Sequence, residues 1–204
     1  MTKSSRIRAA CLVFGLVAVA TAAFGQAPSP TVRVRGTVQS VEGQVLTVKS
    51  REGDSVPITL KDGWTIGGIK AATLADIKPG AFIGTAAMPR GDGPMTAIEV
   101  LVFPPGVKSG EGHYGWDLLP ESTMTNATVA STVAGVSGPV ITLTYPGGEK
   151  QVAVTADTPL VTFAPAEKSD LKPGTAVFLS ATRDGSGLAT SRVTVGNNGI
   201  APPM

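Results

Sequence analysis

The stretch Gly36-Thr-Val-Gln-Ser-Val-Glu-Gly-Gln-Val-Leu-Thr-Val48 decides the fold, because a close copy of it, Ser131-Thr-Val-Ala-Gly-Val-Ser-Gly-Pro-Val-Ile-Thr-Leu143, lies further along the chain. Both stretches alternate apolar and polar residues and carry a glycine turn near their middle. Alternation of this kind is typical of a strand with one buried face, and the turn leads the chain back into a second strand. Each stretch therefore predicts a β-hairpin.

Two later blocks of sequence repeat in the same order and at nearly the same spacing. Asp76-Ile-Lys-Pro-Gly80 matches Asp170-Leu-Lys-Pro-Gly174, and Glu99-Val-Leu-Val102 matches Arg192-Val-Thr-Val195. The general likeness of valine-rich β sequences would explain the match of Glu99–Val102 with Arg192–Val195, but not the match of the two Asp-x-Lys-Pro-Gly blocks. The chain is therefore predicted to contain an internal duplication.

Each copy is predicted to form a compact barrel. In the first copy we expect three strands over 32–60, a helical piece of about two turns over Lys70–Ile77 that ends at Lys-Pro-Gly, and a closing hairpin over 81–103. The second copy repeats this order, with a short turn over Ala166–Leu171. The predicted fold class is all-β, with two tandem small five-stranded OB-like barrels that each carry one short helical turn. The alternative is a single β-sandwich built from both repeats.

These patterns divide the chain into six segments. They are a signal peptide (1–25), an N-terminal linker (26–31), a first β-barrel repeat (32–103), an inter-domain segment (104–128), a second β-barrel repeat (129–196) and a loose C-terminal tail (197–204).

The N-terminus has the three parts of a secretory signal. Lys3, Arg6 and Arg8 precede an uncharged run over 9–24, and small residues in Ala23-Phe-Gly25 predict cleavage before Gln26. The alternative is a retained anchor, but the run is shorter than the roughly 20 residues that a spanning helix needs. We therefore expect a periplasmic protein with no membrane span after cleavage.

Removal of the signal changes which functions the composition favours. The whole chain has 17 basic and 15 acidic residues, and the signal takes three basic residues and the single cysteine with it. The mature chain then has a slight acidic excess, which argues against nucleic acid as a partner. Without cysteine it has no disulfide, zinc thiolate or thiol nucleophile.

The repeated unit resembles a group of exported bacterial proteins with tandem small β-barrel domains of uncharacterised function. The resemblance rests on G-x-V-x-x-V-x-G, L-T-V, D-[LI]-K-x-G and a closing A-x-x-V strand, and it covers nearly all of the mature chain. It implies a fold and no activity. Relatives of this kind sometimes carry labels tied to metal-transporter permeases, whose several spanning helices this chain lacks.

The inter-domain segment 104–128 is where function is expected. It holds the only histidine and one of the two tryptophans, which a plain linker does not need. We interpret Tyr114 and Trp116 as a platform for a ligand ring, with His113, Asp117 and Glu111 supplying hydrogen bonds. The structural alternative is that Trp116, Leu118 and Leu119 only fill the seam between the barrels.

The predicted function is a non-catalytic periplasmic or cell-envelope binding or interaction protein, with an envelope protein, glycan or small molecule as its partner. We expect no catalytic residue and no cofactor, because no nucleophile elbow or paired carboxylate stands out. The alternative is a metal-binding or metal-transport-associated periplasmic protein centred on His113, with Glu111 and Asp117 as further ligands. A single histidine is a weak signal for such a site.

Overall fold

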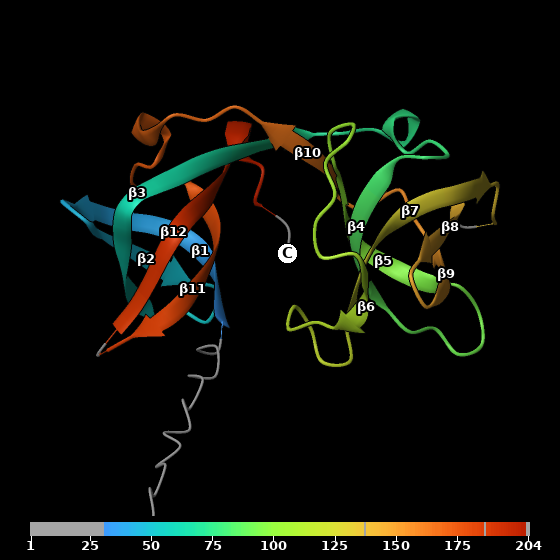
Figure 1. Cartoon of the computed structure of the whole chain (residues 1–204), viewed down its shortest axis with the longest axis horizontal. Helices are drawn as coiled ribbons and strands as arrows, with labels where there is room; N and C mark the ends of the chain where they lie inside the picture. Colours follow the sequence, from blue (N-terminus) through green and yellow to red (C-terminus); the bar gives the residue numbers. More distant parts are fainter. Residues whose placement is uncertain (1–30, 137, 186, 203–204) are drawn as a thin grey trace, which may run out of the picture.

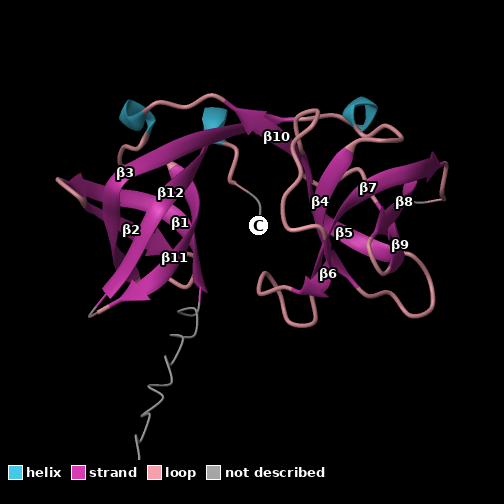
Figure 2. Ribbon diagram, viewed as in Figure 1, coloured by secondary structure: helices cyan, strands magenta, loops and turns pink. Residues whose placement is uncertain are grey.

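The computed structural model describes residues 31–136, 138–185 and 187–202, and it is built from strands (Figure 2). The predicted signal peptide and most of the predicted N-terminal linker lie outside the described residues. The strands are β1 (Thr31–Glu42), β2 (Val45–Ser50), β3 (Ser55–Ala71), β4 (Phe82–Met88), β5 (Met95–Val102), β6 (Gly112–Gly115), β7 (Thr123–Val133), β8 (Val140–Tyr145), β9 (Gly148–Ala153), β10 (Leu160–Ala164), β11 (Ala176–Asp184) and β12 (Gly187–Gly196). None of the helices among the described residues has the length and apolar character needed to cross a bilayer.

A closed five-stranded barrel forms from the two ends of the described chain. The strands pair in the order β1–β2–β3–β12–β11 and back to β1, with β3 and β12 parallel and the other pairs antiparallel. Alternate residues of these strands face inward, as Val34 and Val38 do on β1 and Leu46 and Val48 on β2. We call this part the barrel lobe; it lies on the left of Figure 1.

The middle of the chain forms a second lobe of strands β4–β9, on the right of Figure 1. Its pairing order is β5–β4–β7–β8–β9, and β9 returns to β5 through only two residue pairs, Met95 with Val152 and Thr96 with Ala153. Strand β6 adds to the free side of the first half of β7. This lobe has its own core, which includes Ile83, Val100 and Leu143. Strand β10 joins the lobes, because it pairs with β3 on one side and β5 on the other.

The two separate tandem barrels expected from the repeats are not confirmed. The strands of the barrel lobe come from both predicted repeats, because β1–β3 precede residue 72 and β11–β12 follow residue 175. Both repeats thus contribute to one 12-stranded sheet, as the sandwich alternative expected, but five of its strands close into a barrel. The turn before each closing hairpin is bonded to the other repeat. The Gly174 amide donates to the Val38 carbonyl at 2.9 Å, and the Gly80 amide donates to the Val129 carbonyl at 2.8 Å.

Strand β3 runs beyond the barrel lobe and links it to the second lobe. The sequence predicted that this strand ends near Leu60, but it continues to Ala71 and leaves the barrel toward the second lobe (Figure 1). Its last residues pair with β10, from Gly68 opposite Ala164 to Ala71 opposite Val161. The next hairpin, formed by β4 and β5, therefore lies in the second lobe.

The predicted helical pieces are not shown. The end of β3 occupies the start of 70–77, and only a three-residue 3-10 turn follows, at Leu74–Asp76. A similar 3-10 turn of Lys168–Asp170 stands within the predicted turn 166–171. In the described part of the predicted tail, Ile200 packs against the core cluster that contains Phe82 and Phe103, and Pro202 is buried.

Candidate functional site

Strand β6 carries two of the predicted site residues, and it directs them to opposite faces because successive side chains of a strand alternate. His113 Nδ1 lies 2.8 Å from the Thr125 hydroxyl, and its ring stacks on Tyr145 with centroids 6.1 Å apart. Burial, and then the charge of Lys150, lowers the pKa of His113 below its ordinary value. The imidazole is therefore neutral at pH 7. It lines a cavity of about 460 Å³ on the second lobe.

Tyr114, on the other face, is held by a polar group at the start of β6. Its hydroxyl accepts a hydrogen bond from Asn126 Nδ2 at 2.7 Å and donates to the Gly110 carbonyl at 3.3 Å. Asn126 also donates to the Gly110 carbonyl at 3.2 Å. These bonds fix the tyrosine ring 6.1 Å from the ring of Trp116, centroid to centroid.

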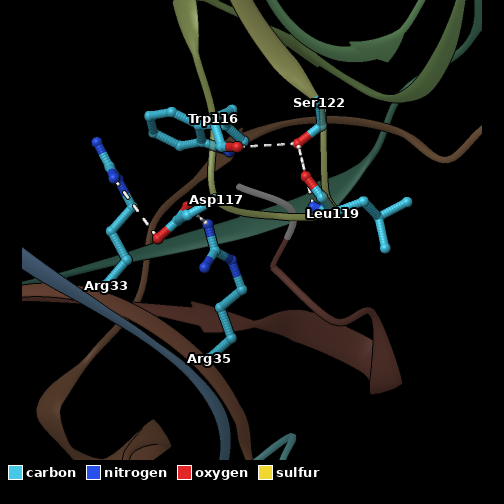
Figure 3. A network of polar contacts seen from close by, with 6 residues as sticks. All are labelled: Arg33, Arg35, Trp116, Asp117, Leu119 and Ser122. Atoms are coloured by element: carbon cyan, nitrogen blue, oxygen red, sulfur yellow. Dashed lines mark hydrogen bonds and ion pairs between the residues drawn. The ribbon is translucent and has the colours of Figure 1, made fainter.

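The loop that joins β6 to β7 is closed on itself by Ser122 (Figure 3). The Ser122 hydroxyl donates to the Leu119 carbonyl at 2.7 Å, has the Trp116 carbonyl 3.1 Å away, and accepts from the Leu119 amide. The Trp116 amide in turn donates to the Ser122 carbonyl at 2.8 Å. Between them, Glu121 has a positive φ of 62°. We call residues 116–122 the Trp116 loop; its closed form presents Trp116 and Asp117 to the barrel lobe.

Asp117 joins the loop to strand β1 of the barrel lobe through two arginines (Figure 3). Arg35 Nη2 donates to Asp117 Oδ1 at 2.8 Å, and Arg33 Nη1 lies 3.5 Å from Asp117 Oδ2. Burial alone would raise the pKa of Asp117, but the Arg35 hydrogen bond and the charges of Arg35 and Arg33 outweigh it and lower that pKa. Asp117 is therefore an ionised carboxylate that spans the two lobes.

Trp116 lies beneath one of these arginines. The Arg33 guanidinium carbon is 3.8 Å from the centroid of the Trp116 ring, within the range of a cation–π contact. The indole Nε1 is buried and has no hydrogen-bond partner among the described residues. Because buried polar groups are normally paired, this free donor marks Trp116 as unusual.

A cavity of about 570 Å³ lies between the lobes beside Trp116, and we call it the inter-lobe cleft. Five aromatic side chains line it, although aromatic residues make up only 5% of the whole chain. They are Phe103, Tyr114, Trp116, Phe163 and Phe178. Two arginines and several hydroxyls line it as well: Arg33, Arg192, Ser109, Ser180, Thr190, Ser191 and Thr194. This combination suits a ring-bearing ligand with polar substituents.

The structure brings only part of the predicted site together. Tyr114 and Trp116 share the inter-lobe cleft, and Asp117 is bonded to Arg33 at its wall, whereas His113 belongs to the other cavity. The seam-filling alternative fits in part, because Leu118 is half-buried while Leu119 is exposed.

The alternative metal ligands are held by different partners. Lys108 Nζ lies 3.6 Å from Glu111 Oε1, so this carboxylate is paired with a lysine. Asp117 is held by Arg33 and Arg35, and the His113 ring contacts the Thr125 hydroxyl. Within residues 31–136, 138–185 and 187–202, no group of three or more His, Cys, Asp or Glu side chains is arranged to hold a metal.

Sequence reasoning missed the residues that the barrel lobe supplies to the cleft. Arg33 and Arg35 stand two apart on β1, so both point out of the barrel on one face. Two arginines on one outward face of a strand are a pattern that sequence analysis could have used to predict a binding surface. Arg192 on β12, and Phe163 on the connecting strand β10, had no such signal, because both lie far from residue 116 in the sequence.

Comparisons with known proteins add no relative to this picture. No protein-family model, no curated protein and no solved structure matches the chain.

Proposed function

We propose that this chain is a non-catalytic binding protein of the bacterial cell envelope, which holds a small ligand in the inter-lobe cleft. The observation that carries the proposal is the concentration of scarce aromatic side chains on one cavity. Ligand sites are mostly apolar concavities with a few placed polar groups, and the cleft has that composition. Trp116, on the same wall, has an indole N–H without a hydrogen-bond partner among the described residues, which also supports the proposal.

The proposed location rests on the N-terminal signal and on the resemblance to exported tandem β-barrel proteins. Cell fractionation with N-terminal sequencing tests it, and we expect a periplasmic chain that begins at Gln26. Recovery of an uncleaved chain in the membrane fraction would contradict this part of the proposal.

We infer that the two lobes are OB-like barrels of a duplicated chain whose closing hairpins are exchanged. The matched pairing orders support the inference. In the barrel lobe, β1, β2 and β3 are followed by β12, parallel to β3, and then β11; in the second lobe, β7, β8 and β9 are followed by β5, parallel to β9, and then β4. In both lobes the last strand pairs back to the first.

Ligand binding is tested with naphthalene probes of three charges: naphthalene-2-sulfonate, naphthalene-2-sulfonamide and a 2-naphthylmethylammonium ion. Binding is followed by backbone-amide NMR of the mature protein. We expect shifts centred on residues that line the cleft. Ser180→Phe places a ring in the cleft and should abolish them, whereas Ser55→Phe, an exposed strand position outside it, should not. If no probe binds the wild-type protein, the proposed cleft function is wrong.

A metal-carrying function centred on His113 gains no specific observation from the structure. The cleft is therefore the first site to test.

A further inference from the structure

We propose that the inter-lobe cleft selects a planar anionic ligand, an aromatic or heteroaromatic acid, whose acid group replaces the Asp117 carboxylate on Arg33 and Arg35. The inference rests on the proposed binding function and names the ligand class for the same site.

The first argument is the charge of the cleft. Arg33 and Arg192 line it, and no aspartate or glutamate does so among the described residues. Arg192 makes no ion pair within the described part of the chain. Arg35 stands behind Arg33 on the same face of β1, with its side chain only 10% exposed. The described lining of the cleft therefore carries two guanidinium groups, those of Arg33 and Arg192, and no carboxylate, which gives this wall a positive charge.

The second argument is that Asp117 already occupies the position of a bound anion. Arg35 holds it at 2.8 Å, a distance that a ligand carboxylate or sulfonate would adopt, and Arg33 lies 3.5 Å from its other oxygen. It is nevertheless accessible, because its side chain is 45% exposed and it is carried by a loop. Partly exposed ion pairs contribute little free energy, so an incoming acid can compete with it.

The third argument is the surface that a ring would find beside that position. Arg33 covers one face of Trp116, while Tyr114, Phe103 and Phe163 continue the aromatic wall of the same cavity. A planar ring buries its apolar faces against such a wall. The Nε1–H of Trp116 is itself buried and lacks an acceptor among the described residues.

The test compares naphthalene-2-sulfonate with its neutral sulfonamide by isothermal titration calorimetry on the mature protein. For the wild type we expect the sulfonate to bind at least about tenfold more tightly, the scale of one charge-assisted hydrogen bond. Asp117→Asn should strengthen sulfonate binding about threefold to fivefold, the scale of one exposed ion pair, and leave sulfonamide binding unchanged.

The matched control is Glu121→Gln, which removes the same charge from an exposed position of the same loop. It should leave both affinities unchanged, so any gain seen only in Asp117→Asn comes from the freed arginines and not from net charge. A second variant, Arg33→Gln, should weaken sulfonate binding and spare the sulfonamide. It keeps the proposal testable if Asp117→Asn folds poorly.

The outcomes separate the two proposals. Equal binding of sulfonate and sulfonamide, or weaker sulfonate binding in Asp117→Asn, overturns the anionic ligand class while cleft binding stands. Binding of none of the probes, in the wild type or in Asp117→Asn, overturns both.

Discussion

Replacing Asp117 by asparagine removes the charge that joins the Trp116 loop to the barrel lobe, and its cost can be worked from the geometry. A charge-assisted hydrogen bond such as that from Arg35 is worth about 1.5–3 kcal/mol when sheltered, and a pair as long and open as that with Arg33 about 0.2–1 kcal/mol. Asp117 is 45% exposed, so solvent screening reduces the first figure. Because asparagine still accepts a neutral hydrogen bond, we expect a net loss of about 1 kcal/mol, or about 2–4 °C in Tm.

The assay is urea unfolding of the mature protein followed by far-UV circular dichroism at pH 7. Asp117→Asn is compared with Glu121→Gln, which should stay within about 0.5 kcal/mol of the wild type. A double-mutant cycle with Arg35→Gln isolates the pair itself.

The pH dependence of the free energy of unfolding provides a second test of the same interaction. The two arginines lower the pKa of Asp117 in the folded protein. The stability that they confer is present above the unfolded pKa of about 3.9 and is lost as the pH falls through the lower folded pKa. The wild type should therefore lose its advantage over Asp117→Asn at acid pH. An advantage absent at pH 7, or unchanged by acidification, would refute the reasoning that Asp117 is an ionised link between the lobes.

Three further predictions follow from the fold and the second cavity. A fragment of residues 26–128 lacks the closing hairpin of the barrel lobe and should show little amide NMR dispersion; a cooperatively folded fragment would mean that the first repeat closes by itself. Gly36→Ala should cost about 1–3 kcal/mol in urea unfolding, because a Cβ there overlaps the carbonyl of a neighbouring strand, whereas Gly115→Ala meets nothing and should be neutral. His113 should titrate below about 6.5 by NMR, so acidification through that value costs stability, and Lys150→Ala should raise its midpoint; a normal midpoint would contradict its burial.

The local elements of this fold were readable from the sequence, but their partners were not. The alternation over 32–41 and the segment Val140–Tyr145, rich in β-branched and apolar residues, each predicted a strand that is confirmed, because burial of alternate side chains leaves a pattern in the sequence. The choice of partner leaves no such pattern. Under the proposed duplication, two similar hairpins would offer each set of three strands nearly the same edge, and the length of β3 would favour one of them.

The same reason explains which part of the candidate site was predicted. Tyr114 and Trp116 stood out because large aromatic residues are scarce and lie within one short segment. Arg33 and Phe163 come from strands remote in sequence, and only the pairing of those strands in the fold brings them to the cavity that Trp116 lines. His113 lines the other cavity because strand β6 turns adjacent side chains to opposite faces, and no pattern in the sequence indicated that this strand pairs with β7.

The crossing of the chain between the lobes also limits how they can move. Two segments cross, one after β3 and one through β10, and they are hydrogen-bonded to each other where they meet. In Figure 1 this double strap lies at the top, while β6 and the loop after it lie at the bottom. Two paired straps resist twisting and sliding, which a single flexible linker would permit. We therefore expect rotation about β10 to be the easiest relative motion of the lobes, and the ion pairs of Asp117 oppose it at the far end of the cleft.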